Sequence, residues 1–224
     1  MQHVLDNPVW NALISGDAAL GTGTGEARYY DRQVSPFAGI KTYTDKSFET
    51  LYQIMPEGVA AFMTPVPVAI PSYWEPVITV AGYQFVFDTT LEPAPVTSSL
   101  TALTDEHVPQ MLELTQLTKP GPFDLRTIRF GQYYGVFDGD KLVAMTGQRM
   151  HVFNYSEISA VCTHPDYLGR GYARQLLLHQ IQLITAEGKI PFLHVRGDNK
   201  RAIEIYKSLG FSIRSEAYFS FVKK

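Results

Sequence analysis

A glycine-rich segment in the second half of the chain has the composition of a phosphate-binding turn. Gly169-Arg170-Gly171 follows a strand predicted over residues 155–163 and opens a helix predicted to reach residue 187. The first turn of a helix exposes unpaired backbone N–H groups and a partial positive charge, which together attract anions. The glycines let the backbone approach a bulky group, and Arg170 and Arg174 add positive charge. These residues alone predict either a diphosphate site or a structural turn that needs glycine for positive φ.

A carboxylate at the start of the same strand is a candidate base. The two-residue period of a strand predicts that Glu157 shares one face with Ser159, Val161 and Thr163. A primary ammonium group, with a pKa of ~10.4, must lose a proton before the amine can attack a carbonyl carbon. Glu157 could accept that proton directly or through water. Its alternative is a charge at a strand end, satisfied by solvent or by an arginine.

A tyrosine on a later helix is a candidate proton donor. Tyr206 follows Asn199 by seven residues and Ala202 by four, so the three share one face of a helix predicted over residues 199–209. A tyrosine hydroxyl, with a pKa of ~10, stays protonated at neutral pH and can donate a proton. The alternative for Tyr206 is an amphipathic tyrosine packed in the core.

The other reactive side chains point less clearly to chemistry. Strand alternation turns Cys162 away from the Glu157 face and predicts a buried packing cysteine rather than a nucleophile. His164 enters a loop, where it contacts a ligand or caps the turn. His194, on a strand predicted over residues 190–195, is an alternative base or a core histidine. The six histidines lack metal-ligand spacing, so no metal site is predicted.

The elements that position these residues have a clear order. Beyond residue 100 the pattern predicts a strand, a helix, three antiparallel strands, a helix, a strand, a helix and a closing hairpin. This order predicts an α/β sandwich rather than a doubly wound fold. The front part is less regular: Asn7-Pro8 is a helix start with Asn7 as cap, and the Gly21–Gly25 stretch is interpreted as a flexible connection. Further elements are a helix over 45–55 and strands over 59–63, 77–80 and 83–87.

Composition limits the class of protein. In 224 residues, 45% hydrophobic and 18% charged side chains suffice for a packed core and carry too little charge for a disordered chain. A net charge of −3 argues against binding nucleic acid by charge neutralisation, and one cysteine excludes an internal disulfide. Neither a signal peptide nor a membrane helix is predicted, since the most apolar stretch, residues 58–71, carries three prolines. We therefore expect a soluble, cytoplasmic protein with no nucleic-acid or membrane partner.

Charge is unevenly divided along the chain. Residues 1–99 carry four basic and ten acidic side chains, a net of −6, whereas residues 100–224 carry 15 basic and 12 acidic ones, a net of +3. Between them, Leu91–Ser99 holds two prolines and a Ser/Thr tail, which is typical of an extended linker. We therefore predict an N-terminal α/β domain of unassigned function, residues 1–95, and a second domain, residues 96–224.

The second domain resembles the GNAT superfamily of acyl-CoA-dependent N-acetyltransferases. The glycine pattern of that family, Arg/Gln-x-x-Gly-x-Gly/Ala, is matched by residues 168–173 except at the first position, where Leu168 offers no polar side chain. The sequence of residues 161–165 is similar to that of the branch that includes the C-terminal domains of glycine N-acyltransferase-like proteins. The second family block, an Asn and a Tyr on the following helix closed by Gly-Phe, is matched by Asn199, Ala202, Tyr206 and Gly210-Phe211.

The resemblance implies a fold, a cosubstrate and a set of site residues. The fold has a mixed, mostly antiparallel sheet flanked by helices, and its strands at Val161 and Val195 splay apart so that acetyl-CoA enters the gap, without a metal. A backbone N–H near Val161 would polarise the thioester carbonyl, Glu157 would be the catalytic base, and Tyr206 would protonate the leaving thiolate. The residues implied to bind the cosubstrate are Val161, Cys162, Thr163, Leu168, Gly169, Arg170, Gly171, Tyr172, Ala173, Arg174, Asn199 and Ala202.

The implied activity is direct transfer of the acetyl group from acetyl-CoA to a primary amine of a small molecule or peptide. The alternatives are transfer of a longer acyl group to an amino acid, and a non-catalytic sensor that binds acyl-CoA. The front domain could shape the acceptor pocket or be a degenerate copy of the same fold, and its negative charge favours a cationic acceptor. Arg196 and Lys200 either contact the adenosine phosphates or are solvated charges.

Overall fold

The computed structural model describes residues 3–97 and 99–224, which form two sheets; Met1, Gln2 and Ser98 of the predicted linker lie outside the described residues. The small sheet has the order β1-β2-β3 and the large sheet the order β4-β11-β5-β10-β9-β8-β7-β6. The strands are β1 (Gly21–Gly23), β2 (Ala27–Tyr30), β3 (Ala38–Ile40), β4 (Val59–Thr64), β5 (Glu75–Phe87), β6 (Thr101–Ala102), β7 (Tyr134–Asp138), β8 (Lys141–Val152), β9 (Tyr155–Thr163), β10 (Ile190–Arg196) and β11 (Phe211–Lys223). The α-helices are α1 (Pro8–Leu13), α2 (Asp45–Ile54), α3 (Val108–Thr118), α4 (Tyr172–Ala186) and α5 (Lys200–Ser208).

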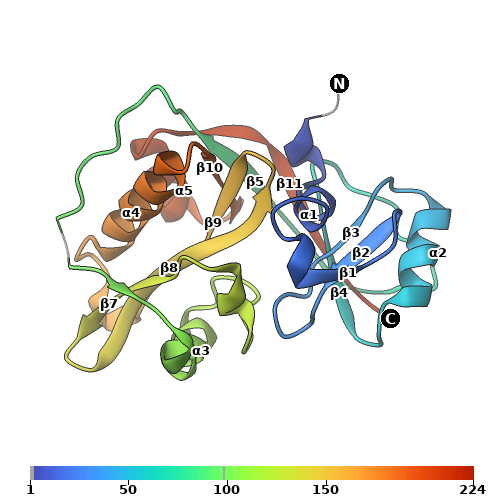
Figure 1. The fold of residues 1–224 in the computed structure, drawn as a ribbon, viewed down its shortest axis with the longest axis horizontal. Helices are drawn as coiled ribbons and strands as arrows, with labels where there is room; N and C mark the ends of the chain where they lie inside the picture. Colours follow the sequence, from blue (N-terminus) through green and yellow to red (C-terminus); the bar gives the residue numbers. More distant parts are fainter. Residues whose placement is uncertain (1–2, 98) are drawn as a thin grey trace.

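Helices cover both faces of the large sheet (Figure 1). α4 and α5 pack against one face, in a core that includes Leu177, Ile203 and the strand residue Ile158. α1 and α3 pack against the other face through Leu13 and Met111. The parallel pair β9–β10 makes the sheet mixed, and its other strand pairs are antiparallel. The predicted α/β fold with a mostly antiparallel sheet between helices is confirmed.

Two strands are longer than the sequence predicts. Residues 77–80 and 83–87 belong to one strand, β5, and the predicted hairpin at the end of the chain is one strand, β11, with a bulge between Ile213 and Ser215. Both predictions were wrong because β5 and β11 pair along their whole length, which supplies partners for the backbone where a turn was expected. Gly82 is not a turn residue; a side chain there would collide with the backbone of Val195 on β10.

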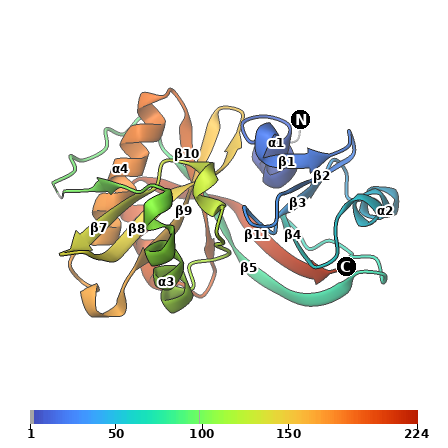
Figure 2. The same ribbon diagram turned by 60° about the horizontal axis from the view of Figure 1, so that its bottom comes forward.

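The large sheet runs across the predicted domain boundary. β4 and β5 precede residue 95, yet both pair with β11 from the end of the chain, and β5 also pairs with β10. Figure 2 shows β5 and β11 running side by side from one half of the molecule to the other. The division at residue 95 and the idea of a degenerate second copy of the fold stay predictions. The strands nevertheless make the two halves neighbours at the centre of one sheet.

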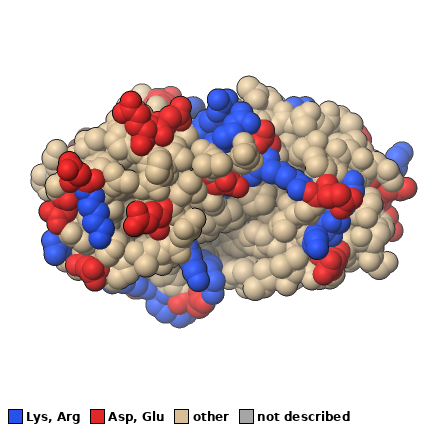
Figure 3. All heavy atoms as spheres, turned by 90° about the horizontal axis from the view of Figure 1, so that it is seen from below, with Lys and Arg blue, Asp and Glu red and all other residues tan. Residues whose placement is uncertain are grey.

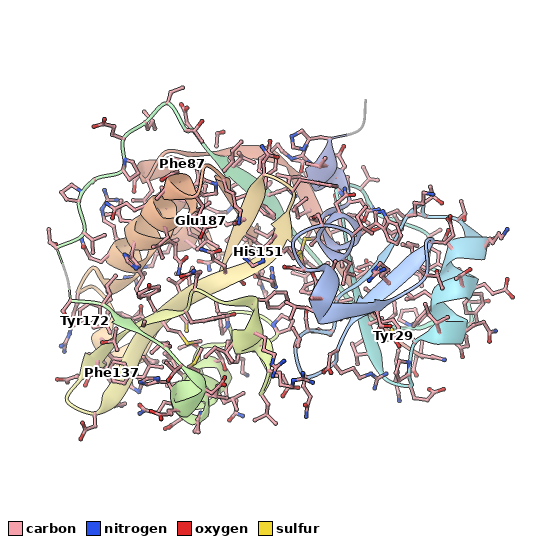
Figure 4. All side chains as sticks on the ribbon, viewed as in Figure 1. Tyr29, Phe87, Phe137, His151, Tyr172 and Glu187 are labelled. Atoms are coloured by element: carbon pink, nitrogen blue, oxygen red, sulfur yellow. The ribbon has the colours of Figure 1, made fainter. Side chains whose placement is uncertain are left out.

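A buried acid and a histidine tie the front segment to β8. The Asp17 carboxylate, in the segment that follows α1, lies 2.6 Å from Nδ1 of His151 and accepts a hydrogen bond of 2.7 Å from the Tyr30 hydroxyl. Figure 4 shows His151 where β8 approaches α1. Because the Asp17 side chain is only 1% exposed, these partners replace the hydrogen bonds that it would otherwise make to water. The pair fixes how the front segment sits against the large sheet.

The start of α1 is confirmed, but its predicted cap is wrong. The Asn7 side chain donates to the carbonyl oxygen of Ile40 at 2.8 Å and makes no cap to α1 within the described residues. The stretch read as a flexible connection contains β1, which pairs with β2. α2 begins as predicted, and its Thr44 cap accepts a hydrogen bond from the Ser47 N–H. No helix among residues 3–97 and 99–224 has the length and apolar character needed to cross a membrane.

Candidate functional site

The two central strands of the large sheet part where the sequence predicts a gap. β10 pairs in parallel with β9 from Ile190–Phe192 to Tyr155–Glu157. Beyond these residues β9 continues in register with β8, and β10 continues in register with β5. The edges of residues 158–163 and 193–196 that face each other therefore lie on either side of an opening. An extended ligand could pair with those edges as a strand would.

β9 bulges where it borders this opening. On β8, Met145 pairs with Cys162 and Gly147 pairs with Ser159, so β9 has one more residue than β8 between the two pairs. Ala160 lies in this bulge with a φ of 53°, which is rare for a residue with a side chain. Over the described residues, Ala160 has no register partner on β8 or β10. The bulge leaves backbone N–H groups available to a ligand carbonyl.

The bulge also reverses the faces predicted for β9. Arg149 pairs with Glu157, and strand alternation places Arg149 on the same face of β8 as the partner of Cys162. Glu157 and Cys162 therefore share one face, and Val161 lies on the opposite face. The predictions that Glu157 shares a face with Val161, and that Cys162 is turned away from it, are wrong. Because successive side chains of a strand point to opposite faces, one inserted residue moves every later side chain of β9 to the other face.

The glycine turn has the geometry of an open anion site. Gly169 and Gly171 have φ values of 82° and 81°, and no described protein atom lies within 4 Å of the position that a Cβ would take at either one. Gly171 is the cap residue of α4 and offers no side chain, so within the described residues no side-chain cap satisfies the first N–H groups of the helix. Arg174 on that first turn donates to the Ser208 hydroxyl at 3.0 Å, which links α4 to α5.

Two cavities with shared walls follow from the turn and the opening. One cavity, at the start of α4, has a volume of about 250 Å³, and the other, which extends from the parted strands to Phe37 and Val80, has a volume of about 430 Å³. We call them the cofactor cavity and the acceptor cavity, after the ligands that the sequence resemblance implies. Figure 3 shows the molecule hollowed near its centre. The predicted site residues that line the cofactor cavity are Val161, Cys162, Thr163, Leu168, Gly169, Gly171, Tyr172, Ala173, Arg174, Asn199, Ala202 and Tyr206.

Two predicted site residues lie outside both linings. The Arg170 guanidinium stacks on the ring of Tyr167, 4.5 Å from its centre. Glu157 is fully buried behind the acceptor cavity. Since Thr163 lines both cavities and its buried hydroxyl oxygen has no hydrogen-bond partner in the part of the chain described, it is available to a ligand.

Tyr206 lies where the two cavities meet. Its ring packs edge-on against Phe85 and Phe211, and the residue is only 7% exposed. Burial raises the pKa of Tyr206 to about 12, so its hydroxyl keeps its proton at neutral pH. Asn199 caps α5 by accepting a hydrogen bond of 3.2 Å from the Ala202 N–H, which fixes the start of the helix that carries Tyr206. Tyr206 is therefore a core residue that also borders both cavities. Its chemical role stays a prediction.

A buried ion pair stands behind the acceptor cavity. Arg149 donates to both carboxylate oxygens of Glu157, through Nε at 2.8 Å and Nη2 at 2.7 Å. Nδ1 of His194 lies 2.7 Å from the same carboxylate. Burial by itself would raise the pKa of Glu157, but the charge and hydrogen bonds of Arg149 and His194 outweigh it and hold the pKa at about 2. A carboxylate held in this way is a weak proton acceptor, so its surroundings favour the alternative of a charge satisfied by an arginine.

His194 is held as a neutral ring by its two neighbours. The Gln84 amide Nε2 donates to the backbone carbonyl of Leu5 at 3.0 Å and lies 2.9 Å from Nε2 of His194. An amide N–H can only donate, so Nε2 of His194 accepts and Nδ1 carries the proton that goes to Glu157. Burial lowers the pKa of His194, which agrees with the neutral form. Both ring nitrogens are engaged, as in a satisfied core histidine.

The remaining reactive side chains have structural surroundings. Burial raises the pKa of the Cys162 thiol to about 11, which leaves it a packing residue rather than a nucleophile. The His164 side chain caps a turn by accepting from the Asp166 N–H at 3.3 Å. Arg196 lines the acceptor cavity and pairs with Asp198 at 2.7 Å, and Lys200 begins α5. Among residues 3–97 and 99–224, no group of three or more His, Cys, Asp or Glu side chains is placed to hold a metal ion.

Sequence reasoning suggested that the front domain could shape this cavity but named none of its residues; Phe37 and Val80 come from that part of the chain. It did not single out Arg149, Phe219 or Phe221, which line the same cavity. None follows a motif. The signal that could have found Arg149 is the alternation of side chains along β8. Once β8 and β9 are paired, this alternation places Arg149 opposite Glu157.

Comparisons with known proteins agree with this geometry. The family model of the FR47-like proteins matches residues 133–220. A solved structure of a GNAT-family protein from Novosphingobium aromaticivorans is 34% identical, covers 100% of this chain and 99% of its own, and superposes with a TM-score of 0.88. A GCN5-related N-acetyltransferase from Kribbella flavida covers 96% of this chain and 94% of its own at 13% identity, with a TM-score of 0.63, and shows the fold alone.

A curated relative matches part of this chain. The N-alpha-acetyltransferase RimI of Mycobacterium tuberculosis is 36% identical over 83 residues, which are 35% of this chain and 51% of that protein. The match therefore spans about half of the relative's length.

Proposed function

Because the chain belongs to the GNAT family of acetyltransferases, we propose that it transfers the acetyl group of acetyl-CoA to the primary amine of a small molecule or peptide. The observation that carries the proposal is the pair of joined cavities. The cofactor cavity begins at the uncapped first turn of α4, and the acceptor cavity opens from its far end, with Val161 and Tyr206 lining both.

The cofactor cavity suits the cosubstrate at both of its ends. The N–H groups at the start of α4 would bind the diphosphate, because no side chain of the described residues caps them and they lie at the positive end of the helix. The parted edge of β9 would pair with the amide groups of the pantetheine arm, as a strand pairs with a neighbour. A side chain at Gly171 would occupy the space that the diphosphate needs.

The reaction requires one new bond and one broken bond. The amine nitrogen attacks the thioester carbonyl carbon, negative charge develops on the carbonyl oxygen, and the carbon–sulfur bond then breaks to release the CoA thiolate. A free N–H at the bulge around Ala160 would stabilise the developing oxyanion. Tyr206 would donate a hydrogen bond to the departing sulfur. Its pKa of about 12 keeps the hydroxyl protonated.

The amine must also lose a proton, and Glu157 stays a predicted base. With a pKa of about 2 and both oxygens bound to Arg149, it is poorly suited to take the proton directly. We infer that the proton leaves through water in the acceptor cavity and that Glu157 acts mainly by holding Arg149.

A thiol-release assay combined with calorimetry tests the proposal. Purified protein should bind acetyl-CoA and CoA, and it should release free thiol from acetyl-CoA when a suitable amine is present. No heat of binding with either cosubstrate would overturn the proposal. Binding without thiol release across amino acids, polyamines, aminoglycosides and peptides would instead identify the acyl-CoA sensor.

The size and walls of the acceptor cavity support the alternative of a longer acyl group. Beyond Val161 the cavity of about 430 Å³ is lined by Phe37, Val80, Phe219 and Phe221, which could pack against an acyl chain. A series of acyl-CoA donors from acetyl to octanoyl separates the two activities. A kcat/KM that is highest for acetyl-CoA supports acetyl transfer, and one that rises with chain length supports the alternative.

A further inference from the structure

The acceptor cavity is lined by cations and by no acid. Lys119, Arg149 and Arg196 line it, and there is no Asp or Glu among its described lining residues. The charges of Arg149 and Arg196 are matched by Glu157 and Asp198, whereas Lys119 has no ion-pair partner in the described chain. The cavity thus keeps a net positive charge. This lining opposes the cationic acceptor that the charge of the front segment suggested, because those acidic residues lie elsewhere.

Arg149 presents an unused edge to this cavity. Its Nε and Nη2 atoms bind Glu157, and its guanidinium lies 4.8 Å from the centre of the Phe37 ring. Nη1 makes no hydrogen bond to the described residues, and the side chain is 11% exposed. A guanidinium fixed on one edge and one face loses little conformational entropy when its other edge binds a planar anion.

The groups behind Arg149 act as its support. Glu157 is 0% exposed, and it also accepts from His194, whose other nitrogen accepts from Gln84. This chain ends on the backbone carbonyl of Leu5, so the orientation of each polar group is set by the next one. Glu157 and His194 are therefore positioning residues for Arg149.

The rest of the cavity wall is apolar and aromatic. Phe37, Phe219 and Phe221 line the same space as Arg149. Three phenylalanine rings beside one guanidinium suit a ligand with an apolar side group next to an anionic group.

Building on the proposed function, we propose that the acceptor is an amine that also carries a carboxylate and an apolar side group, as an amino acid does. The carboxylate binds the free edge of Arg149 and the side group packs on the phenylalanine rings. The amine then points toward the thioester at Val161, which lines both cavities. Arg149 is thus a specificity-determining residue.

Matched acceptor pairs test this inference directly. The assay compares thiol release from acetyl-CoA with L-phenylalanine and with 2-phenylethylamine, and with L-leucine and 3-methylbutylamine. Within each pair only the carboxylate differs. We expect kcat/KM to be about 100-fold higher for the carboxylate-bearing member, because its absence leaves the Arg149 donors unpaired.

Variants connect the preference to Arg149. Arg149→Gln should reduce the preference for L-phenylalanine over 2-phenylethylamine in kcat/KM from about 100-fold to less than threefold, mainly by raising KM for L-phenylalanine. Because this change leaves Glu157 buried without its cation, the double variant Arg149→Gln/Glu157→Gln keeps the site neutral, and CoA affinity by calorimetry reports whether either protein is folded. The control is Arg126→Gln, an arginine paired with Asp31 outside both cavities.

The outcomes separate this inference from the proposed function. Equal kcat/KM within both acceptor pairs, or a preference that survives in the folded double variant, would overturn the inference and leave acetyl transfer standing. Equal turnover of L-phenylalanine and a peptide with N-terminal phenylalanine would also overturn it, since the peptide lacks the nearby carboxylate. No thiol release with any acceptor would overturn both proposals.

Discussion

The cofactor cavity and the acceptor cavity form the two ends of one groove, and these ends are built in different ways. The cofactor end consists of one stretch, residues 161–174, and one face of α5, and its central groups are backbone N–H groups. The acceptor end brings together side chains from segments as distant as Phe37, Arg149 and Phe221. The first end therefore depends on backbone conformation, whereas the second depends on which side chains the sheet brings together.

This difference assigns separate tasks to the two ends. A backbone cradle binds a phosphate group and tolerates most side-chain changes, provided that its glycines can keep their conformation. A wall of side chains from several strands can change its ligand by single substitutions without any change in the cradle. Variants at the two ends should therefore separate cosubstrate affinity from acceptor choice.

The largest expected effect is at the glycine turn. Gly171→Val should weaken CoA binding by about 100-fold or more, because valine is strained at a φ of 81° and its side chain fills the space in front of the helix. Calorimetry with CoA measures the effect.

Gly188→Val is the matched control for this change. Gly188 lies just beyond the other end of α4, with a φ of 71° and open space around the position of a Cβ. Both variants should lose similar stability, and Gly188→Val should bind CoA like the wild type. If the two variants lost equal affinity, general destabilisation would explain the result and the cradle would not.

The next effect concerns the residue shared by both ends. Tyr206→Phe should lower kcat by about 10- to 100-fold while the Kd for acetyl-CoA stays within about twofold, since only the hydroxyl at the departing sulfur is lost. Steady-state kinetics and calorimetry on the same preparation give both values. Tyr43→Phe, a half-buried tyrosine outside both cavities, is the control. A parallel loss of acetyl-CoA affinity would show that Tyr206 shapes the cavity rather than assisting the leaving group.

How far each end could be predicted depends on how local it is. The bounds of β9 and the glycine turn were predictable because their determinants are consecutive residues whose preferences act within one turn or strand. The bulge at Ala160 was not, because an extra residue is visible only after β8 and β9 are paired. Arg149 and Phe37 are 112 positions apart, and only the folded sheet and the Phe37 segment bring them into contact.

Glu157 offers a test of whether the acceptor end also supplies the base. Glu157→Gln should raise KM for L-phenylalanine about tenfold by releasing Arg149, and should change kcat for 2-phenylethylamine less than threefold. A catalytic base would instead be needed for both acceptors. A loss of kcat of about 100-fold with both amines would show that Glu157 is the base and that the acceptor end takes part in the reaction.

The smallest expected effect is the dependence of stability on pH at the acceptor end. Burial lowers the pKa of His194. Its contribution to the unfolding free energy is therefore present at pH values above the usual histidine pKa of ~6.5 and is lost as the pH falls below that value. The pKa of Glu157 is held at about 2, so Glu157 contributes to the unfolding free energy at pH values above the usual pKa of a glutamate. That contribution is lost only as the pH falls toward 2. Urea unfolding at pH 7.5 and 5.5 should therefore show wild-type stability falling with pH.

His194→Gln separates this histidine from the others, because glutamine does not titrate. The decrease in unfolding free energy between pH 7.5 and 5.5 should be smaller in the variant by about 1 kcal/mol. An unchanged dependence in His194→Gln would mean that the ring gains a proton without cost in the fold, and the neutral, rigid support assigned to Arg149 would have to be abandoned.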